Sequence, residues 1–375
     1  MSGPVEPEGE ERLEDGIALC LSGGGYRAML FHVGSLWRLN ELGYLPKLAR
    51  ISSVSGGSIT AATLGLHWSR LDFDSRGVAN NLREEFVGPI RNLAGKTIDV
   101  GSVLQGIFTP GTVADKVTAA YRKHLFGKAT LQQLPDEPRF VINATNLQTG
   151  ALWRFSKPYM ADYQVGRILN PTVELAVAVA ASSAFPPVLS PLRLTVDPEA
   201  FEVESRGPLY APPFSSEVVL SDGGVYDNLG LETAWKRYRT ILVSDGGGQM
   251  QPEGEIASDW ARHAIRVNSV IDNQVRNLRK RQTIAGFQRN DRHGTYWGIR
   301  TPLADYGPPD GSLDCPAEQT ALLAAVKTRL EDMDDVLQQR LINWGYAVTD
   351  AAMRRWLEPA AQPPPGFPYA QAGIG

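Results

Sequence analysis

The sequence has little cysteine, little histidine and no long apolar run. Its 375 residues include two cysteines and five histidines. Cys20 and Cys315 lie far apart in the chain, so we expect neither a disulfide framework nor a cysteine metal site, which fits a reducing compartment. No stretch reaches the roughly 18 apolar residues that a membrane-spanning helix needs. We therefore expect no transmembrane segment, and any contact with lipid to be peripheral.

The chain also lacks a basic excess and an apolar leader. It carries 37 Lys and Arg against 41 Asp and Glu, a net charge of −4. A dedicated nucleic-acid binder usually has a basic excess, because neutralising phosphates supplies most of its affinity, so we expect no nucleic-acid partner. Residues 1–14 are acidic and polar and do not resemble a secretory signal. We expect them to be disordered and the protein to be cytoplasmic, with peripheral contact to a membrane.

Two strand–turn–helix units in succession predict a parallel sheet. A strand over 17–21 leads into a glycine loop and a helix over 28–42. A second strand over 51–54 leads into a turn of small residues and another helix. Because such units wrap helices around a sheet, we predict an α/β fold with three layers, a mostly parallel central sheet flanked by helices. Further strands are predicted over 139–144, 151–155, 218–220 and 241–243.

No linker or repeat divides the chain, so we expect one domain over residues 15–357. Residues 75–128 are less regularly patterned and are expected to form an insertion, either a lid or a side wall. The part over 256–357 is predicted to be mainly helical. The Pro- and Gly-rich residues 358–375 are predicted to form a flexible tail.

A long amphipathic helix is predicted over 256–280. Its apolar positions are interpreted as facing the core; they are Ile265, Val270, Ile271, Val275 and Leu278. Its C-terminal end is basic, through Arg276, Arg279, Lys280 and Arg281. Two interpretations of this basic end remain: a solvated helix end that complements the helix dipole, or a patch that faces phospholipid.

A serine turn between the second strand and its helix is the first candidate catalytic motif. The turn reads Ser53-Val54-Ser55-Gly56-Gly57. A nucleophile elbow places its serine at such a turn, between small neighbours and before a helix N-terminus. The usual pattern is Gly-x-Ser-x-Gly, and Ser53 replaces its first glycine. Ser55 is the candidate nucleophile, with Gly56 expected beside the substrate; Ser58 and a purely structural turn are the alternatives.

The glycine loop after the first strand is the second candidate. Gly23, Gly24 and Gly25 present backbone N–H groups at the start of a helix, where they can hold an oxyanion or a phosphate. A phosphate loop would continue with a lysine that is missing here, so a nucleotide site is a poor interpretation. Arg27 follows the glycines. It is expected to orient a substrate phosphate or to brace the loop.

Two aspartates are candidate partners for Ser55. Asp222 and Asp245 each end a predicted strand and are each followed by glycines. Chain order permits a triad completed by His263 or His293. No histidine, however, lies in a glycine-rich loop like those of the serine and the aspartates. A serine–aspartate pair without histidine is therefore compatible with the residues.

Several stretches in this order resemble the patatin-like phospholipases. They are Gly-Gly-Gly-Tyr-Arg at 23–27, the Ser55 turn, residues 144–150, residues 181–187 and residues 222–228. The resemblance runs from about residue 18 to residue 248. It implies an α/β fold that is also akin to the catalytic domain of cytosolic phospholipase A2.

The resemblance also implies a mechanism. Ser55 would be the nucleophile, Asp222 the general base, and the N–H groups of the loop from Gly23 to Gly25 the oxyanion hole. Arg27 matches a basic position of the family pattern. The implied activity is that of a carboxylic ester hydrolase of the phospholipase A or lysophospholipase type, acting on phospholipid or another acyl-ester lipid without metal or cofactor. The alternatives are a thioesterase or acyltransferase that uses soluble acyl donors, and an inactive lipid-binding scaffold.

Overall fold

The computed structural model of the chain describes residues 13–98 and 112–375. The expectation of a disordered start concerns residues 1–14, of which only the last two are described. The central part of the expected lid, 99–111, also lies outside the described residues.

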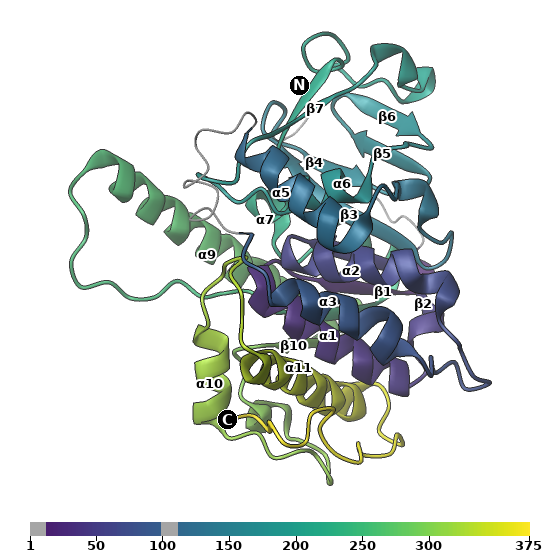
Figure 1. Ribbon diagram of the computed structural model, residues 1–375, viewed down its shortest axis with the longest axis vertical. Helices are drawn as coiled ribbons and strands as arrows, with labels where there is room; N and C mark the ends of the chain where they lie inside the picture. Colours follow the sequence, from purple (N-terminus) through teal and green to yellow (C-terminus); the bar gives the residue numbers. More distant parts are fainter. Residues whose placement is uncertain (1–12, 99–111) are drawn as a thin grey trace.

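Five parallel strands form one half of the central sheet. Their order is β10, β9, β1, β2, β3. The strands are β1 (Glu14–Leu21), β2 (Leu48–Val54), β3 (Arg139–Asn146), β9 (Tyr238–Asp245) and β10 (His293–Gly298). The two predicted strand–turn–helix units are thus confirmed, and they lie side by side in the middle of this half (Figure 1).

The other half of the sheet is antiparallel and was not predicted as such. From β3 the sheet continues through β4 (Leu152–Phe155), β5 (Tyr159–Asp162) and β6 (Gly166–Leu169). In addition, β8 (Glu217–Asp222) pairs with β3, and β7 (Leu192–Thr195) pairs with β8, both antiparallel. The sheet is therefore mixed, and β3 is the strand at which its direction changes.

Helices cover both faces of the sheet. The helices are α1 (Gly25–Glu41), α2 (Gly56–His67), α3 (Gly88–Ala94), α5 (Val113–Tyr121), α6 (Leu175–Ser182), α7 (Gly224–Asp227), α8 (Glu232–Trp235), α9 (Trp260–Gln288), α10 (Ala317–Ala325) and α11 (Asp335–Trp356). The first helix packs between α2 and α11, whereas α8 packs on β1, β2 and β9. In the described part of the chain, no helix combines the length and the apolarity that crossing a bilayer requires.

The alternation of side chains along β1 explains the three layers. Leu19 and Leu21 point into the larger hydrophobic core, beneath α1 and α2. Ala18 and Cys20 point the other way, into a smaller core shared with α8. A strand that buries both faces has to be apolar throughout, as parallel strands in α/β proteins are. The predicted three-layer α/β fold is confirmed: helices lie on both sides of a mixed sheet whose strands from β10 to β3 are all parallel.

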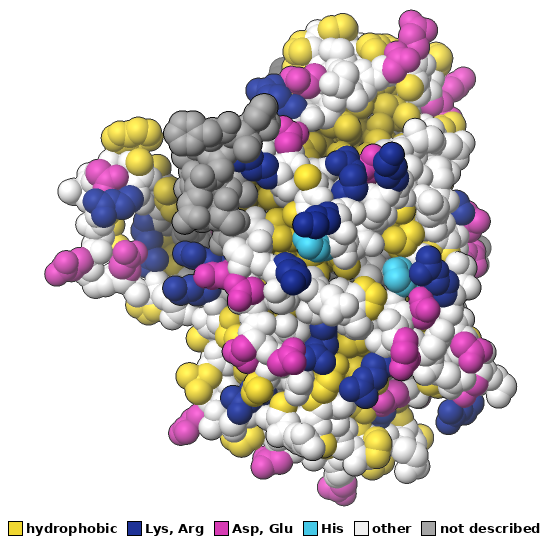
Figure 2. All heavy atoms as spheres, viewed as in Figure 1, with side chains coloured by type: hydrophobic (Ala, Val, Ile, Leu, Met, Phe, Trp, Pro, Cys, Tyr) yellow, Lys and Arg dark blue, Asp and Glu magenta, His cyan; other side chains and the backbone are white. Residues whose placement is uncertain are grey.

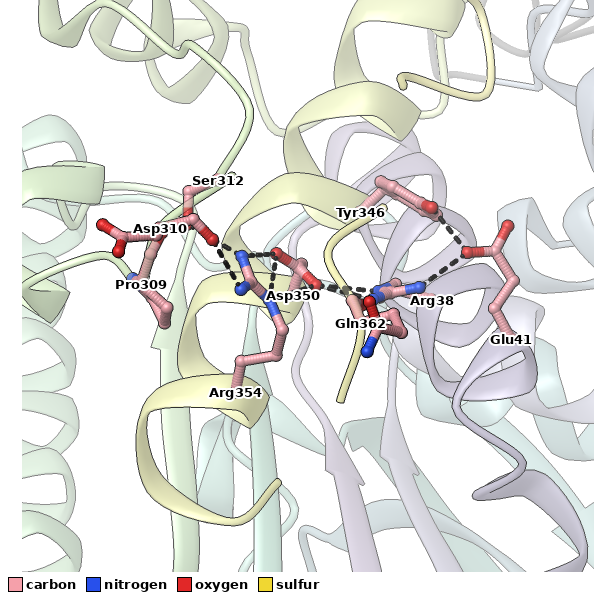
Figure 3. Close-up of polar contacts among 9 residues, drawn as sticks. All are labelled: Arg38, Glu41, Pro309, Asp310, Ser312, Tyr346, Asp350, Arg354 and Gln362. Carbon is pink, nitrogen blue, oxygen red and sulfur yellow. Dashed lines mark hydrogen bonds and ion pairs between the residues drawn. The ribbon is translucent and has the colours of Figure 1, made fainter. Parts of the chain in front are cut away.

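A buried ion-pair network joins the first helix to the last (Figure 3). Asp350 of α11 accepts hydrogen bonds from Arg38 of α1 at 2.9 Å and from Arg354 at 2.9 Å. All three side chains are at most 5% exposed. Arg38 also pairs with Glu41, which accepts a hydrogen bond from Tyr346 at 2.5 Å. The C-terminal part of the chain is thereby fixed to the helix that follows the glycine loop.

The chain end runs back along α11. The tail over 358–375 was expected to be flexible. Its Tyr369 and Ile374 are buried, and the Asn343 amide of α11 donates to the carbonyls of Tyr369 and Gly373 at 2.9 and 2.8 Å. These contacts give the tail a fixed path despite its proline and glycine content.

The interpretation of α9 as a core-facing helix is wrong. All five positions predicted to face the core are exposed: Ile265, Val270, Ile271, Val275 and Leu278. Within α9 only Thr283 and Gly286, near its C-terminal end, are buried. The rest of the helix projects from the body of the molecule (Figure 1). Periodicity reveals that a helix has an apolar side, but it does not reveal what that side faces.

The described parts of the 75–128 segment form a side wall. The helices α3 and α5 lie beside α1, α2 and α6. Phe86, Ile90 and Leu93 are fully buried in the larger core, and so is Tyr121 of α5. Since these residues belong to the main core, the described parts pack as an integral layer of the domain.

Candidate active site

Ser55 occupies a strained turn between β2 and α2. Its backbone lies at φ 52° and ψ −119°, a conformation that residues other than glycine rarely adopt. The Ser55 hydroxyl caps no N–H group of the helix behind it. The strain therefore turns the side chain out of the strand direction and leaves the hydroxyl to other partners, as a nucleophile elbow requires.

The two glycines after Ser55 allow the turn to pack against the glycine loop. A Cβ on Gly56 would lie 2.2 Å from the carbonyl oxygen of Gly25, and one on Gly57 would lie 2.4 Å from that of Leu21. The Gly57 N–H donates to the Ser22 carbonyl at 3.2 Å. Larger residues would push the serine turn away from the loop, which explains the Ser-Gly-Gly sequence.

Ser182, at the end of α6, fixes the serine turn through hydrogen bonds. Its hydroxyl accepts a hydrogen bond from the Ser55 N–H at 2.9 Å and donates to the Asn143 carbonyl at 2.6 Å. Ser58, the alternative nucleophile, is completely buried and hydrogen-bonds to Ser182. Sequence reasoning assigned no role to Ser182. The feature of the sequence that could have indicated its role is a single serine at the end of an otherwise apolar helix.

The register of β3 brings Asp222 next to Ser55. On one edge of β3, Val54 of β2 pairs with Asn143, and the next residue, Ala144, pairs with Asp222 of β8. The two strands thus end beside each other on the same edge. Since Ser55 follows Val54 directly, the sheet places the serine and the aspartate together.

The Ser55 side chain lies close enough to the Asp222 carboxyl to lower its pKa. Asp222 is 2% exposed, and its Oδ1 accepts the Gly224 N–H at 2.7 Å. Burial raises the pKa of this carboxyl to about 7. The hydrogen bond from Gly224 and the nearby Ser55 hydroxyl lower the pKa, and the charge of Asp272 on α9 raises it. A carboxyl with such a pKa can exchange a proton near neutral pH.

Asp245, the other candidate partner, has a different environment. Its carboxylate accepts hydrogen bonds from the Tyr296 hydroxyl at 2.5 Å and from the Gly247 N–H at 2.9 Å. It ends β9, which lies on the far side of β1 from β2. Asp245 therefore fixes the loop after β9, and Asp222 is the aspartate that meets Ser55.

No hydrogen bond joins Ser55 to any of the five histidines, all of which lie within the described ranges. His32 is fully buried and bonds to the Ser244 hydroxyl at 2.8 Å. Burial lowers the pKa of His32 to about 4, so its ring is neutral at physiological pH. His263 and His293, which chain order allowed as third members of a triad, are exposed.

The glycine loop provides N–H groups close to the serine. In the described part of the chain, no hydrogen bond occupies the N–H of Gly24, Gly25 or Gly56. The Gly23 N–H, by contrast, donates to the Asn228 carbonyl at 3.0 Å. Gly23 was expected to share in the oxyanion hole, but its donor is already used. Gly56, expected to contact substrate, offers a free donor directly after the serine.

Arg27 braces the site from inside the protein. Its Nη2 donates to the Gly246 carbonyl at 3.0 Å and its Nη1 to the Val326 carbonyl at 2.6 Å. Arg27 is 2% exposed, and burial lowers the pKa of its guanidinium to about 10. Of the two roles left open by the sequence, the contacts favour bracing, because the fork already binds two loops of the protein.

Residues from the C-terminal part of the chain also cover the glycine loop. The Arg329 carbonyl accepts the Tyr26 N–H at 2.9 Å, and a Cβ on Gly25 would lie 2.6 Å from the same oxygen. The C-terminal part, for which the sequence indicated no role, thus closes one side of the site.

The chain is similar to known proteins in two comparisons. A profile of the patatin-like phospholipase family matches residues 19–235. Among solved structures, human GIVD cytosolic phospholipase A2 is 13% identical, with a TM-score of 0.49, over 91% of this chain and 61% of that one. VipD from Legionella pneumophila is 16% identical, with a TM-score of 0.33, over 89% of this chain and 66% of that one. A search of curated proteins found no match.

This chain spans about three fifths of the length of the cytosolic phospholipase A2 structure. The family profile covers more than half of the 375 residues, from β1 through α8, and includes both Ser55 and Asp222. The resemblance drawn from the sequence is thereby confirmed. The chain belongs to the patatin-like phospholipase family.

Proposed function

We propose that the protein is a serine acyl hydrolase that cleaves fatty acyl esters of membrane lipids, in the manner of a phospholipase A or lysophospholipase. Ser55 is the nucleophile and Asp222 the general base. The observation that carries the proposal is the position of a serine on a strained turn beside a buried carboxyl, set by the pairing of β2 and β8 with adjacent residues of β3. The pKa of that carboxyl is raised to about 7. Membership of the family supports a lipid ester as the substrate.

The first half of the reaction forms an acyl-enzyme. The Asp222 carboxylate accepts the Ser55 proton while Ser55 Oγ attacks the ester carbonyl carbon. When the tetrahedral intermediate collapses, the C–O bond of the ester breaks. The leaving alcohol, a lysolipid when the substrate is a diacyl phospholipid, takes the proton from Asp222.

The second half releases the fatty acid. Asp222, again ionised, accepts a proton from a water molecule that attacks the acyl-enzyme carbonyl. Collapse of this second intermediate breaks the bond to Ser55 Oγ, and the serine recovers its proton from Asp222. Each half thus uses the same aspartate first as base and then as acid, so a pKa near neutrality suits both steps.

The negative oxygen of each intermediate is assigned to the free N–H groups of Gly24, Gly25 and Gly56. These donors lie at the starts of α1 and α2, where the helix dipoles also favour negative charge. Loss of one such donor typically costs about 100- to 1,000-fold in rate. The close approach of Gly56 to Gly25 supports their joint assignment.

The test is acyl release from mixed phospholipid vesicles by the wild type and by Ser55→Ala and Asp222→Asn, with Asp245→Asn as the matched control. We expect both dyad variants to lose activity by several orders of magnitude and the control to retain most of it. Thermal melting of each variant checks folding. An active Asp222→Asn protein would reject the assignment of the base.

Two further outcomes would redirect the proposal. If the wild type hydrolyses soluble thioesters faster than vesicle lipids, the protein is a thioesterase or acyltransferase that uses soluble acyl donors. If Ser55 is not labelled by an alkyl fluorophosphonate and no ester is cleaved, the protein is a lipid-binding scaffold.

A further inference from the structure

Most of the helix α9 is exposed among the residues that the structure describes. It runs over 29 residues, Trp260–Gln288, and its two buried residues, Thr283 and Gly286, lie near its C-terminal end (Figure 1). In the space-filling view, its outer end carries hydrophobic side chains, and Lys and Arg side chains lie along it (Figure 2).

The apolar residues of α9 follow one side of the helix. Steps of three or four residues, which keep to one face, connect the members of an exposed stripe. The stripe consists of Trp260, Ala264, Val267, Ile271, Val275 and Leu278. Trp260 is 85% exposed, Ile271 56% and Leu278 52%. So much ordered apolar surface marks an interaction site, because exposure to water is unfavourable.

The charge of α9 identifies the kind of partner. The helix contains six Arg or Lys residues and one Asp. Four of the arginines form ion pairs with carboxylates of the protein, and Lys280 and Arg281 add basic charge toward the C-terminal end of the helix. An apolar stripe on a basic helix, with a tryptophan at one end, is the pattern of helices that lie in the interface of anionic membranes. Pairing with the α9 of a second copy is less favourable, because it would bring together two helices that each have an excess of Lys and Arg over Asp and Glu.

The inner side of α9 connects the stripe to the catalytic residues. Arg276 donates a hydrogen bond to the Gly248 carbonyl, in the loop that Arg27 also holds. Asp272, which is paired with Arg276 at 2.8 Å, is close enough for its charge to act on Asp222. The helix that carries the stripe is therefore anchored beside the candidate active site.

Exposed apolar residues also adjoin Asp222 itself. Val225, three residues after it, is 50% exposed, and Phe185 is 60% exposed. Phe185 directly follows Ala184, whose carbonyl accepts the Asp222 N–H at 2.9 Å. The surroundings of the aspartate thus offer further apolar surface to a lipid.

We propose that the exposed stripe of α9 docks the protein on anionic phospholipid membranes, with the exposed basic side chains of the helix at the level of the headgroups. This inference rests on the proposed function, in that it supplies the surface from which Ser55 would draw its lipid substrate.

The test measures binding without turnover. Ser55→Ala protein is sedimented with vesicles of phosphatidylcholine alone and of phosphatidylcholine with phosphatidylglycerol. We expect binding to the anionic vesicles to be at least tenfold tighter, and to weaken in 0.5 M salt. The double substitution Ile271→Asp/Leu278→Asp, made in the Ser55→Ala protein, should reduce this binding at least tenfold. Both side chains are exposed, so thermal melting should be unchanged.

The matched control is Leu322→Asp, which removes an equally exposed leucine, 67% accessible, from α10. It should bind vesicles as the parent does. Equal binding by the stripe variant and the control would overturn the proposal, as would a parent protein that binds no anionic vesicle. A dimer in light scattering that the stripe substitutions convert to a monomer would assign the stripe to a second copy instead. Because vesicle binding by the Ser55→Ala protein is measured without any catalysis, the binding result would stand even if the proposed hydrolase activity were disproved.

Discussion

The backbone N–H of Ser55 donates a hydrogen bond to the hydroxyl of Ser182. The same hydroxyl is anchored to β3 through the Asn143 carbonyl, so it fixes the serine turn relative to the strand that also positions Asp222. We expect Ser182→Ala to reduce kcat about 5- to 30-fold, the equivalent of about 1–2 kcal/mol, with little change in KM. Steady-state kinetics on a soluble ester measures both. The control is Ser215→Ala, since Ser215 is a buried serine whose hydroxyl has no partner among the described residues. Equal kinetics in the two variants would contradict a positioning role.

The bracing role of Arg27 predicts how its loss divides between kcat and KM. Lysine keeps the charge, but its single ammonium group cannot reach both Gly246 and Val326 as the guanidinium does. For Arg27→Lys we expect kcat to fall about tenfold, KM for a short ester to stay within about twofold, and the melting temperature to decrease. A raised KM with unchanged kcat would mean that Arg27 binds substrate.

The charge of Asp272 predicts a shift in the pH profile. Asp222 must be ionised to act as base, so kcat/KM should rise with pH through about 7, the pKa of Asp222, and level off above it. Asp272 raises this pKa, so removing its charge lowers the pKa and moves the rising limb to lower pH. Asp272→Asn should show this displacement in kcat/KM measured from pH 5 to 9. The control, Glu318→Gln on the exposed start of α10, should leave the pH profile unchanged.

The positive φ of Ser55 predicts that glycine at this position gives a more stable protein than alanine does. Glycine adopts φ 52° freely, whereas alanine retains the strain of the native serine. We expect Ser55→Gly to be more stable than Ser55→Ala by about 1 kcal/mol, after the greater freedom of glycine in the unfolded chain is taken into account. Both variants should be inactive. Urea unfolding compares them, and a less stable glycine variant would argue against strain at this turn.

The network around Asp350 predicts a large loss of stability. Replacing Asp350 by asparagine leaves the buried guanidinium groups of Arg38 and Arg354 without their shared carboxylate. Removing one partner of a buried ion pair costs about 3–5 kcal/mol, and we expect a decrease in the free energy of unfolding of about that size. Urea denaturation measures it. Asp74→Asn, which breaks the exposed pair with Arg76, should cause only a small change.

The central features of the site were predictable from the sequence because they depend on local rules. Glycines after β1 and after Ser55 stand where strands turn into helices, and that pattern is visible in any strand–turn–helix unit. The choice of Asp222 over Asp245 had another origin. It rested on resemblance, since both residues end a strand before glycines, and only the pairing of β8 with β3 separates them in space.

Features that depend on distant contacts were not predictable. The antiparallel half of the sheet consists of short strands, and only their partners define them. Five apolar positions of α9 were assigned to the core because an apolar face is usually buried; three of them, Ile271, Val275 and Leu278, belong to the exposed stripe. No rule of periodicity identifies a helix that leaves the body of the protein. The occupied N–H of Gly23 likewise depends on Asn228, far along the chain.

Under the proposed mechanism, the meeting of β2 and β8 on one edge of β3 also determines when the chain can become active. A growing or partly folded chain has no base for Ser55 until β8 has been synthesised and has paired with β3. Under the proposed mechanism, such a chain is harmless to the membranes around it. The time at which a fluorophosphonate begins to label Ser55 would then report when β8 pairs with β3 during folding.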